Sequence, residues 1–286
     1  MKIVRIDGGL GNQLFQYAFY CYLCDVSREK VYVDVNCFNP HQSRDMFSLF
    51  DIKPCPAPAG KVRYFHRNGI WHLLRPTDRL GITKPRYLWD RDLGSKDVKD
   101  IKNAYFRGYW QIGMYAEKEK ERLTAECKPM TLLEHADEAH RNRNLELLKE
   151  IENTQSVGVH FRGGDYLEND AVYGGCCTKE YYQRALEMIR QEIPEAKFYF
   201  FTNDPVYLKN IGLKTEGHIV DLNDEEWGHL DLLLMSRCKH RIMANSSFSW
   251  WASWFHTEED GMVLMPSMWE RERKSDELRI RNWRLI

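Results

Sequence analysis

Strands and helices alternate strictly through the second half of the chain, and this alternation constrains the fold more than any other feature. Short runs rich in Val, Ile, Phe and Tyr, such as 156–161 and 197–202, are each followed by a helical stretch, such as 178–193. Alternation of this kind is typical of a parallel sheet with helices on both faces. We predict the final strand of this series at 261–266, followed by a C-terminal helix.

A shorter series of the same kind opens the chain. Residues 2–6 and 30–35 indicate strands, and apolar residues recur at helical spacing through 14–27. Between 37 and 100, frequent prolines predict loops and short helices. We therefore expect an α/β protein with two Rossmann-like parallel-sheet domains that face a cleft. Residues 1–150 form the first domain in this prediction, and residues 151–286 form the second.

Composition excludes several classes of function. The formal net charge of −1 lacks the basic excess of a nucleic-acid-binding protein. No apolar run approaches the roughly 20 residues of a membrane-spanning helix, and the N-terminus reads as a strand, so we expect a cytoplasmic protein. The C-terminal segment 269–286 mixes charged and aromatic residues, which also suits peripheral contact with a membrane surface. The eight cysteines are expected to be reduced thiols.

A polar turn follows the predicted strand at 156–161. It contains His160, Arg162, Gly163, Gly164 and Asp165. The carboxyl end of a parallel strand faces the ligand crevice, and a planar guanidinium there suits a diphosphate. His160 lies on the same strand face as Arg162, and Asp165 would orient the arginine or bind the ligand. The alternative is a structural Arg–Asp pair.

Three other predicted strands also end in polar residues. Hydroxyl and N–H groups at a helix N-terminus bind anions, although the same residues are common helix caps. An acid after the fourth strand could accept hydrogen bonds from guanine N1 and N2, or it could be an exposed loop acid. The donor-site candidates on these strand ends are Asn203, Asp204, Asp221, Asn245, Ser246, Ser247 and Phe248.

A glycine turn, "GGLGNQ", follows the first strand and begins a helix. Gly9 and Gly11 fit a dinucleotide-binding fingerprint, but Leu14 occupies its third glycine position. The amides of Asn12 and Gln13 instead suit a polyhydroxyl ligand, unless Asn12 simply caps the helix. The run Asp-Arg-Asp at 90–92 lies among weak signals, and no His/Cys/acid cluster has metal-binding spacing. We expect no metal ion and no cofactor.

These motifs together resemble those of the bacterial galactoside α-1,2-fucosyltransferases. The matches span nearly the whole chain in the expected order: "GGLGNQLFQYA", "GYWQ", "HFRGGDY", "FYFFTND" and "DLLLMSRCKHRIMANSSFSWWASW". The resemblance implies a two-domain GT-B fold, GDP-fucose as donor and metal-independent transfer with inversion. It also implies a galactose-containing oligosaccharide or lipid-linked glycan as acceptor, as in O-antigen or capsule biosynthesis.

The resemblance also assigns residues. His160 and Arg162 match a family motif in which a second arginine occupies the position of Gly163, so Arg162 would carry more of the phosphate charge here. Asn12 matches an asparagine near the reaction centre of related enzymes, and Arg162 and Asn12 are therefore the catalytic candidates. Gly11, Gln13 and Trp110 are the acceptor-side candidates. Two alternatives stay open: an NAD(H)-dependent nucleotide-sugar dehydrogenase and a non-catalytic sugar- or nucleotide-binding module.

Overall fold

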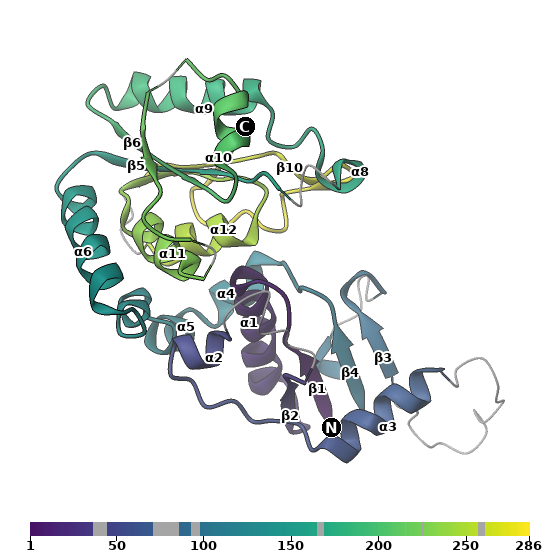
Figure 1. Cartoon of the computed structure of the whole chain (residues 1–286). Helices are drawn as coiled ribbons and strands as arrows, with labels where there is room; N and C mark the ends of the chain where they lie inside the picture. Colours follow the sequence, from purple (N-terminus) through teal and green to yellow (C-terminus); the bar gives the residue numbers. More distant parts are fainter. Residues whose placement is uncertain are drawn as a thin grey trace. The chain divides into compact units, whose positions relative to one another are not determined.

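The chain folds into two compact units, Met1–Glu126 and Cys127–Ile286 (Figure 1). The computed structural model describes residues 1–36, 45–70, 86–92, 98–164, 169–214, 216–224, 226–256 and 261–286. The division falls earlier than the boundary we expected at 150. Helix α6 (Glu138–Glu152) packs against α11 (Gly228–Arg237) and therefore belongs to the second unit.

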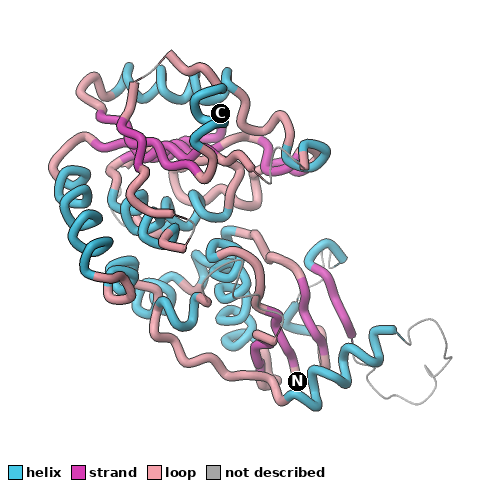
Figure 2. The backbone as a smooth tube through the Cα atoms, in the orientation of Figure 1, coloured by secondary structure: helices cyan, strands magenta, loops and turns pink. Residues whose placement is uncertain are grey.

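The first unit is built around a four-stranded parallel sheet with the order β2-β1-β4-β3 (Figure 2). The apolar side chains of Ile3 and Val4 on the central strand are fully buried. Its strands are β1 (Lys2–Arg5), β2 (Val31–Asp34), β3 (Arg86–Trp89) and β4 (Ala104–Arg107), and its helices are α1 (Leu10–Val26), α2 (Met46–Leu49), α3 (Ala59–Ile70), α4 (Gly113–Lys118) and α5 (Lys120–Glu126), with short 3₁₀ turns at Asp90–Asp92 and Val98–Asp100.

The second unit carries a six-stranded parallel sheet with the order β12-β9-β8-β5-β6-β7. Its strands are β5 (Ser156–Phe161), β6 (Lys197–Thr202), β7 (His218–Val220), β8 (His240–Ile242), β9 (Val263–Met265) and β12 (Arg284–Leu285). Besides α6 and α11, its helices are α8 (Asp170–Tyr173), α9 (Lys179–Glu192), α10 (Pro205–Asn210) and α12 (Ser247–Trp254), with a 3₁₀ turn at Pro129–Leu133. Both units thus have the Rossmann-like parallel sheets expected from the sequence.

Strand β5 lies at the centre of the second sheet, and every one of its residues is buried. Helix α9 covers one face of the sheet, while α11 and α12 lie on the other (Figure 1). Gly158 permits the close approach of α11, because a Cβ atom there would lie 3.1 Å from Cys238 Sγ and Met235 Cγ. The chain order reverses between β5 and β8, which is the place where open α/β sheets bind ligands.

The C-terminal segment forms no helix, contrary to our expectation. It folds into an antiparallel hairpin of β10 (Met268–Glu270) and β11 (Arg273–Lys274), and β12 then joins the edge of the main sheet. The tryptophans at 250, 251 and 254 are buried core residues. The seven cysteines that the structure describes are free thiols, as expected. No helix within the described residues is long and apolar enough to cross a membrane.

Candidate active site

The polar turn after β5 is held in place by the end of the neighbouring strand β6. The amide of Gly163 donates to Asn203 Oδ1 over 3.1 Å, and the amide of Gly164 donates to Asp204 Oδ2 over 3.2 Å. Asp204 also caps α10 by accepting from the Tyr207 amide. Asn203 and Asp204 were donor-site candidates, but these side-chain oxygens fix the turn that carries the half-buried Arg162.

The two glycines of this turn have different requirements. A Cβ atom at Gly163 would lie 2.7 Å from Asp204 Cβ and 3.0 Å from Tyr207 Cβ, so this position has no room for a side chain. Gly164 instead adopts a φ of +58°, which favours glycine. The second arginine of the related motif therefore cannot be accommodated at 163 with this backbone. The obstacle at Gly163 is therefore steric.

His160 is a neutral imidazole beside the arginine. Its side chain is buried, and this burial, together with the charge of Arg162, lowers its pKa to about 3. Its Nδ1 atom has no hydrogen-bond partner among the described residues. Its ring centroid lies 5.3 Å from that of Phe248 on the neighbouring α12. At neutral pH His160 therefore adds no positive charge beside Arg162.

Helix α12 begins at the end of β8, the strand next to β5. Ser246 precedes its first turn and makes no side-chain cap, so the side chain does not occupy the first helical amides. Ser247 and Phe248 are half-buried at this end. Asn245 differs from our expectation: its buried amide donates to the Trp269 carbonyl over 3.0 Å and supports β10.

The remaining donor-site candidates lie apart from the arginine turn. Asp221 follows β7 and its side chain is exposed. Strand β6 separates β7 from β5, so Asp221 lies on the same edge of the sheet as Arg162 but two strands away. Asp165 falls outside the described residues.

In the first unit, the structure brings two of the sequence motifs together. Asn12, in the first turn of α1, accepts a hydrogen bond of 3.0 Å from Gln111 Nε2 beyond β4. Gln13 is instead fully buried, because its amide bonds the Gly8 carbonyl and the Met46 amide. Gly11 is buried within the helix. Of these candidates, Asn12 remains the one whose polar side chain lies at the surface of the turn.

The acceptor-side candidate Trp110 lies in the core of the first unit. Its ring is buried and stacks on Phe19, with centroids 3.9 Å apart. The neighbouring Tyr109 has 45% of its surface exposed. Trp110 has a φ of +54°, an unusual value for a residue with a side chain, and this turn directs the indole into the core. Tyr109 is the aromatic side chain available to a ligand here.

Gln16 and Asp90 organise this end of the sheet. Gln16 on α1 accepts from the Asp7 amide over 2.8 Å and donates to Asp7 Oδ1 and to the Gly108 carbonyl. Asp90 accepts from the Tyr109 amide over 2.9 Å, and a Cβ atom at Gly108 would collide with it. Gln16 and Asp90 thus hold the loops after β1 and β4. In the sequence, Gln16 follows the glycine turn and Asp90 belongs to the Asp-Arg-Asp run.

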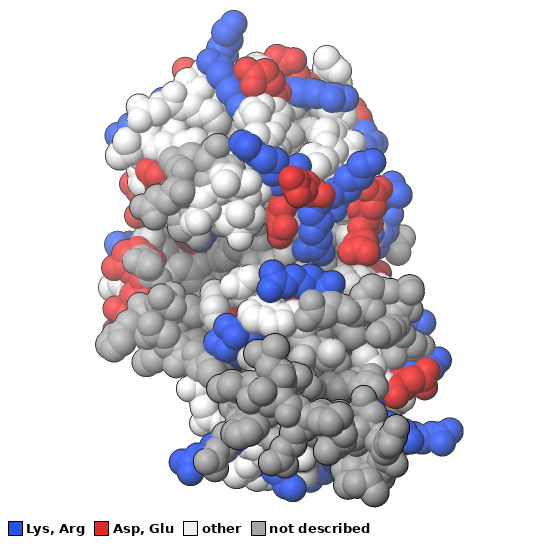
Figure 3. Space-filling view, turned by 90° about the vertical axis from the view of Figure 1, so that its right-hand side faces the viewer, with Lys and Arg blue, Asp and Glu red and all other residues white. Residues whose placement is uncertain are grey.

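On the face drawn in Figure 3, Lys and Arg side chains lie beside Asp and Glu side chains and form no continuous basic area among the residues described. Within the described ranges, no three His, Cys, Asp or Glu side chains are grouped as a metal site. Asp90, from the Asp-Arg-Asp run, instead supports the loop beyond β4.

The family model of glycosyl transferase family 11 matches residues 85–286. The chain belongs to this family. This match covers the whole donor-side turn and α12, and it replaces the dehydrogenase alternative. The family 11 chain is therefore a glycosyltransferase with two Rossmann-like units.

Curated relatives of this family 11 chain include bacterial and mammalian transferases. It is 29% identical to an α-1,2-colitosyltransferase of Escherichia coli, over 94% of this chain and 93% of the relative. It is 25% identical to the O-antigen biosynthesis glycosyltransferase WbnK of Escherichia coli, over 97% and 98% of the two chains. A galactoside α-(1,2)-fucosyltransferase 1 of Bos taurus is 28% identical over 34% of this chain and 28% of its own length.

Proposed function

We propose that this glycosyltransferase moves L-fucose from GDP-fucose to the 2-hydroxyl of a galactoside, with inversion and without a metal ion. The observation that carries the proposal is the juxtaposition of Arg162, at the end of β5, with the N-terminus of α12, at the end of the adjacent β8. A permanent cation and free helical amides at a switch point suit a diphosphate leaving group.

The chemistry follows from the charges involved. The 2-hydroxyl oxygen attacks the anomeric carbon of fucose, its proton passes to a base, and the bond from that carbon to the β-phosphate oxygen breaks. Negative charge accumulates on GDP as it leaves. In our proposal Arg162 and the first amides of α12 stabilise this charge, which is usually the largest contribution to such catalysis. His160, which is neutral, hydrogen-bonds the donor.

We assign the acceptor-side role to the first unit. Asn12 and Gln111 are hydrogen-bonded to each other at its surface, and the exposed Tyr109 lies beside them in the chain. Amides and an aromatic face are the groups that polyhydroxyl ligands prefer. Because a relative is named for O-antigen biosynthesis, we propose a galactose-containing glycan carried on a lipid as the acceptor. That substrate would bring the enzyme to a membrane surface.

The decisive experiment measures GDP release from GDP-fucose with a panel of galactosides, followed by linkage analysis of the product. An α-1,2-fucosylated product is expected. The colitosyltransferase relative favours a second donor sugar. Colitose is fucose without its 3-hydroxyl, so the same panel should be run with the colitose donor. If the colitose donor is turned over faster, colitose replaces fucose as the proposed donor sugar. Binding of GDP-fucose without turnover by any acceptor would instead favour a non-catalytic binding module.

A further inference from the structure

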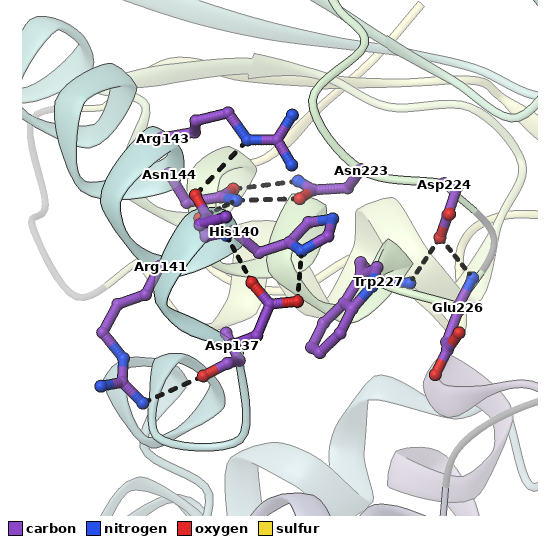
Figure 4. Close-up of polar contacts among 11 residues, drawn as sticks. Asp137, His140, Arg141, Arg143, Asn144, Asn223, Asp224, Glu226 and Trp227 are labelled. Atoms are coloured by element: carbon purple, nitrogen blue, oxygen red, sulfur yellow. Dashed lines mark hydrogen bonds and ion pairs between the residues drawn. The ribbon is translucent and has the colours of Figure 1, made fainter.

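A pair of asparagines joins helix α6 to the segment that follows β7. Asn144, fully buried on α6, donates to Asn223 Oδ1 over 2.8 Å, and Asn223 donates back to Asn144 Oδ1 over 2.9 Å (Figure 4). The second N–H of Asn144 donates to the His140 carbonyl over 2.8 Å, and that of Asn223 donates to Asp231 Oδ1 over 2.7 Å. All four amide hydrogens are used, so both side chains have a defined orientation.

A second set of contacts, next to this network, also fixes the segment that follows β7. Asp137 caps α6 and also contacts His140 Nδ1 over 2.8 Å. The His140 ring stacks on Trp227, with centroids 4.5 Å apart and ring planes 21° apart. Asp224 accepts from the Trp227 amide (Figure 4). The segment after β7 is thus fixed to the start of α6 and to the start of α11.

Removing polar side chains such as Asn144 from water costs desolvation free energy. Apolar side chains would fill the same space without a desolvation penalty. A fully satisfied polar network instead specifies one arrangement of the groups around it. Here the network holds Asn223, which lies within the stretch Asp221–Asp224 whose two end residues are exposed.

The place of this stretch relates it to the donor. Because β5, β6 and β7 are neighbouring parallel strands, their carboxyl ends meet at one edge of the sheet. Two strand spacings, roughly 10 Å, separate β7 from the strand that ends at Arg162. A donor whose diphosphate lies at Arg162 would therefore extend its nucleoside along this edge toward Asp221.

We infer that Asn144, Asn223 and Asp231 are positioning residues, which hold Asp221–Asp224 as the nucleoside-contacting segment of the donor site. This inference rests on the proposed function for its ligand. Its consequence is selective: loss of the network weakens binding of the nucleoside and leaves binding of the diphosphate intact.

Calorimetry with two probes, GDP and inorganic pyrophosphate, tests the inference on the full chain. Asn223→Ala is expected to weaken GDP binding about tenfold, the effect of one or two lost hydrogen bonds, with unchanged pyrophosphate affinity. Asn153→Ala is the matched control, because Asn153 is an exposed amide at the other end of α6.

If Asn223→Ala fails to fold, Asp221→Ala provides a second test, because Asp221 is exposed and its replacement should not disturb folding. It too should weaken GDP binding but not pyrophosphate binding. Unchanged GDP affinity in a folded Asn223→Ala or Asp221→Ala variant overturns the inference alone. An equal loss for both probes also overturns it, because the network would then support the whole sheet edge. If the wild-type protein binds neither GDP nor pyrophosphate, the proposed function is overturned as well.

Discussion

At the scale of single residues, the proposed donor site depends on Arg162, which lies on a turn with no room for a side chain at Gly163. The turn is fixed by Asn203 and Asp204, and the neighbouring His160 carries no charge. Arg162 therefore has no adjacent cation in the motif to share the phosphate charge. The following three predictions concern this turn and the buried Asp231.

Arg162→Lys should lose most of the activity although it keeps the charge. A lysine offers a point charge where two phosphate oxygens favour a planar fork. Loss of such a preorganised donor costs about 3–4 kcal/mol, a rate loss of about a hundredfold to a thousandfold. Initial rates with GDP-fucose measure this, and Arg237→Lys, at an exposed ion pair with Glu152, is the control. An Arg162→Ala variant that keeps more than about a tenth of the rate would show that the arginine is structural.

Gly163→Ala should destabilise the second unit, because the new methyl group collides with Asp204 and Tyr207. Overpacking of this kind typically costs about 1–3 kcal/mol. Gly163→Arg should cost more and should not rescue Arg162→Lys. Thermal melting measures both effects. Gly60→Ala is the control, since nothing lies within 4 Å of a Cβ atom there. A Gly163→Ala variant that melts like the wild type would contradict the steric explanation.

Asp231 should make the stability depend on pH. Burial raises its pKa to about 7, although the hydrogen bond from Asn223 opposes the shift. The folded state thus favours the protonated form, and the stability that this form contributes is present near pH 4 and is lost as the pH rises through 7. Asp231→Asn removes the titration. Its free energy of unfolding, measured by denaturant titration, should match that of the wild type at pH 4 and exceed it at pH 8 by a few kcal/mol, at about 1.4 kcal/mol per pKa unit. The prediction is refuted if the stabilities of the wild type and Asp231→Asn change with pH in the same way.

At the scale of secondary-structure elements, helix α1 connects the ends of two strands. Gln16 bonds both the Asp7 backbone after β1 and the Gly108 carbonyl after β4. It therefore links α1, which carries Asn12, to the loop after β4 that carries Gln111. In our proposal the acceptor-side geometry depends on this link.

Gln16→Leu should raise the KM for the acceptor about tenfold, as expected for the loss of one or two buried hydrogen bonds, and leave GDP affinity unchanged. The leucine keeps the volume of the side chain and removes its bonds. Acceptor kinetics and GDP calorimetry separate the two effects. Gln183→Leu, at an exposed amide on α9, should change neither. An equal loss of GDP affinity in Gln16→Leu would show that the first unit also binds the donor.

The sequence predicted the elements of the second unit well, because β5, β6, β8 and β9 are largely buried runs and helices separate the successive strands. It missed β3, which lies in a proline-rich region without periodicity, and the final strand, which lies among alternating charges. Side-chain partners were harder still. The motif containing Trp110 could not show which aromatic ring faces solvent, because a positive φ at Trp110 breaks the alternation. Gln16 bonds a carbonyl 92 positions away, and no local pattern reports such a contact.

At the scale of the whole molecule, catalysis should not require a metal ion, because the proposed stabilisation comes from Arg162 and helical amides. We expect the initial rate in EDTA to equal the initial rate of the same enzyme with added Mn²⁺ or Mg²⁺. Activity that disappears in chelator and returns with either cation would overturn the proposed mechanism.

The order of strands in the two sheets also bears on how the chain is synthesised. Strand β1 pairs with Val31–Asp34 on one side, but its other neighbour begins at Ala104. Strand β5 likewise pairs with β6 and then with β8, a full helix–strand–helix series later. Each central strand leaves the ribosome before both of its partners exist, with an apolar edge open to other chains. Such non-local pairing is slow to form, so the nascent protein should depend on chaperones more than its mature surface suggests.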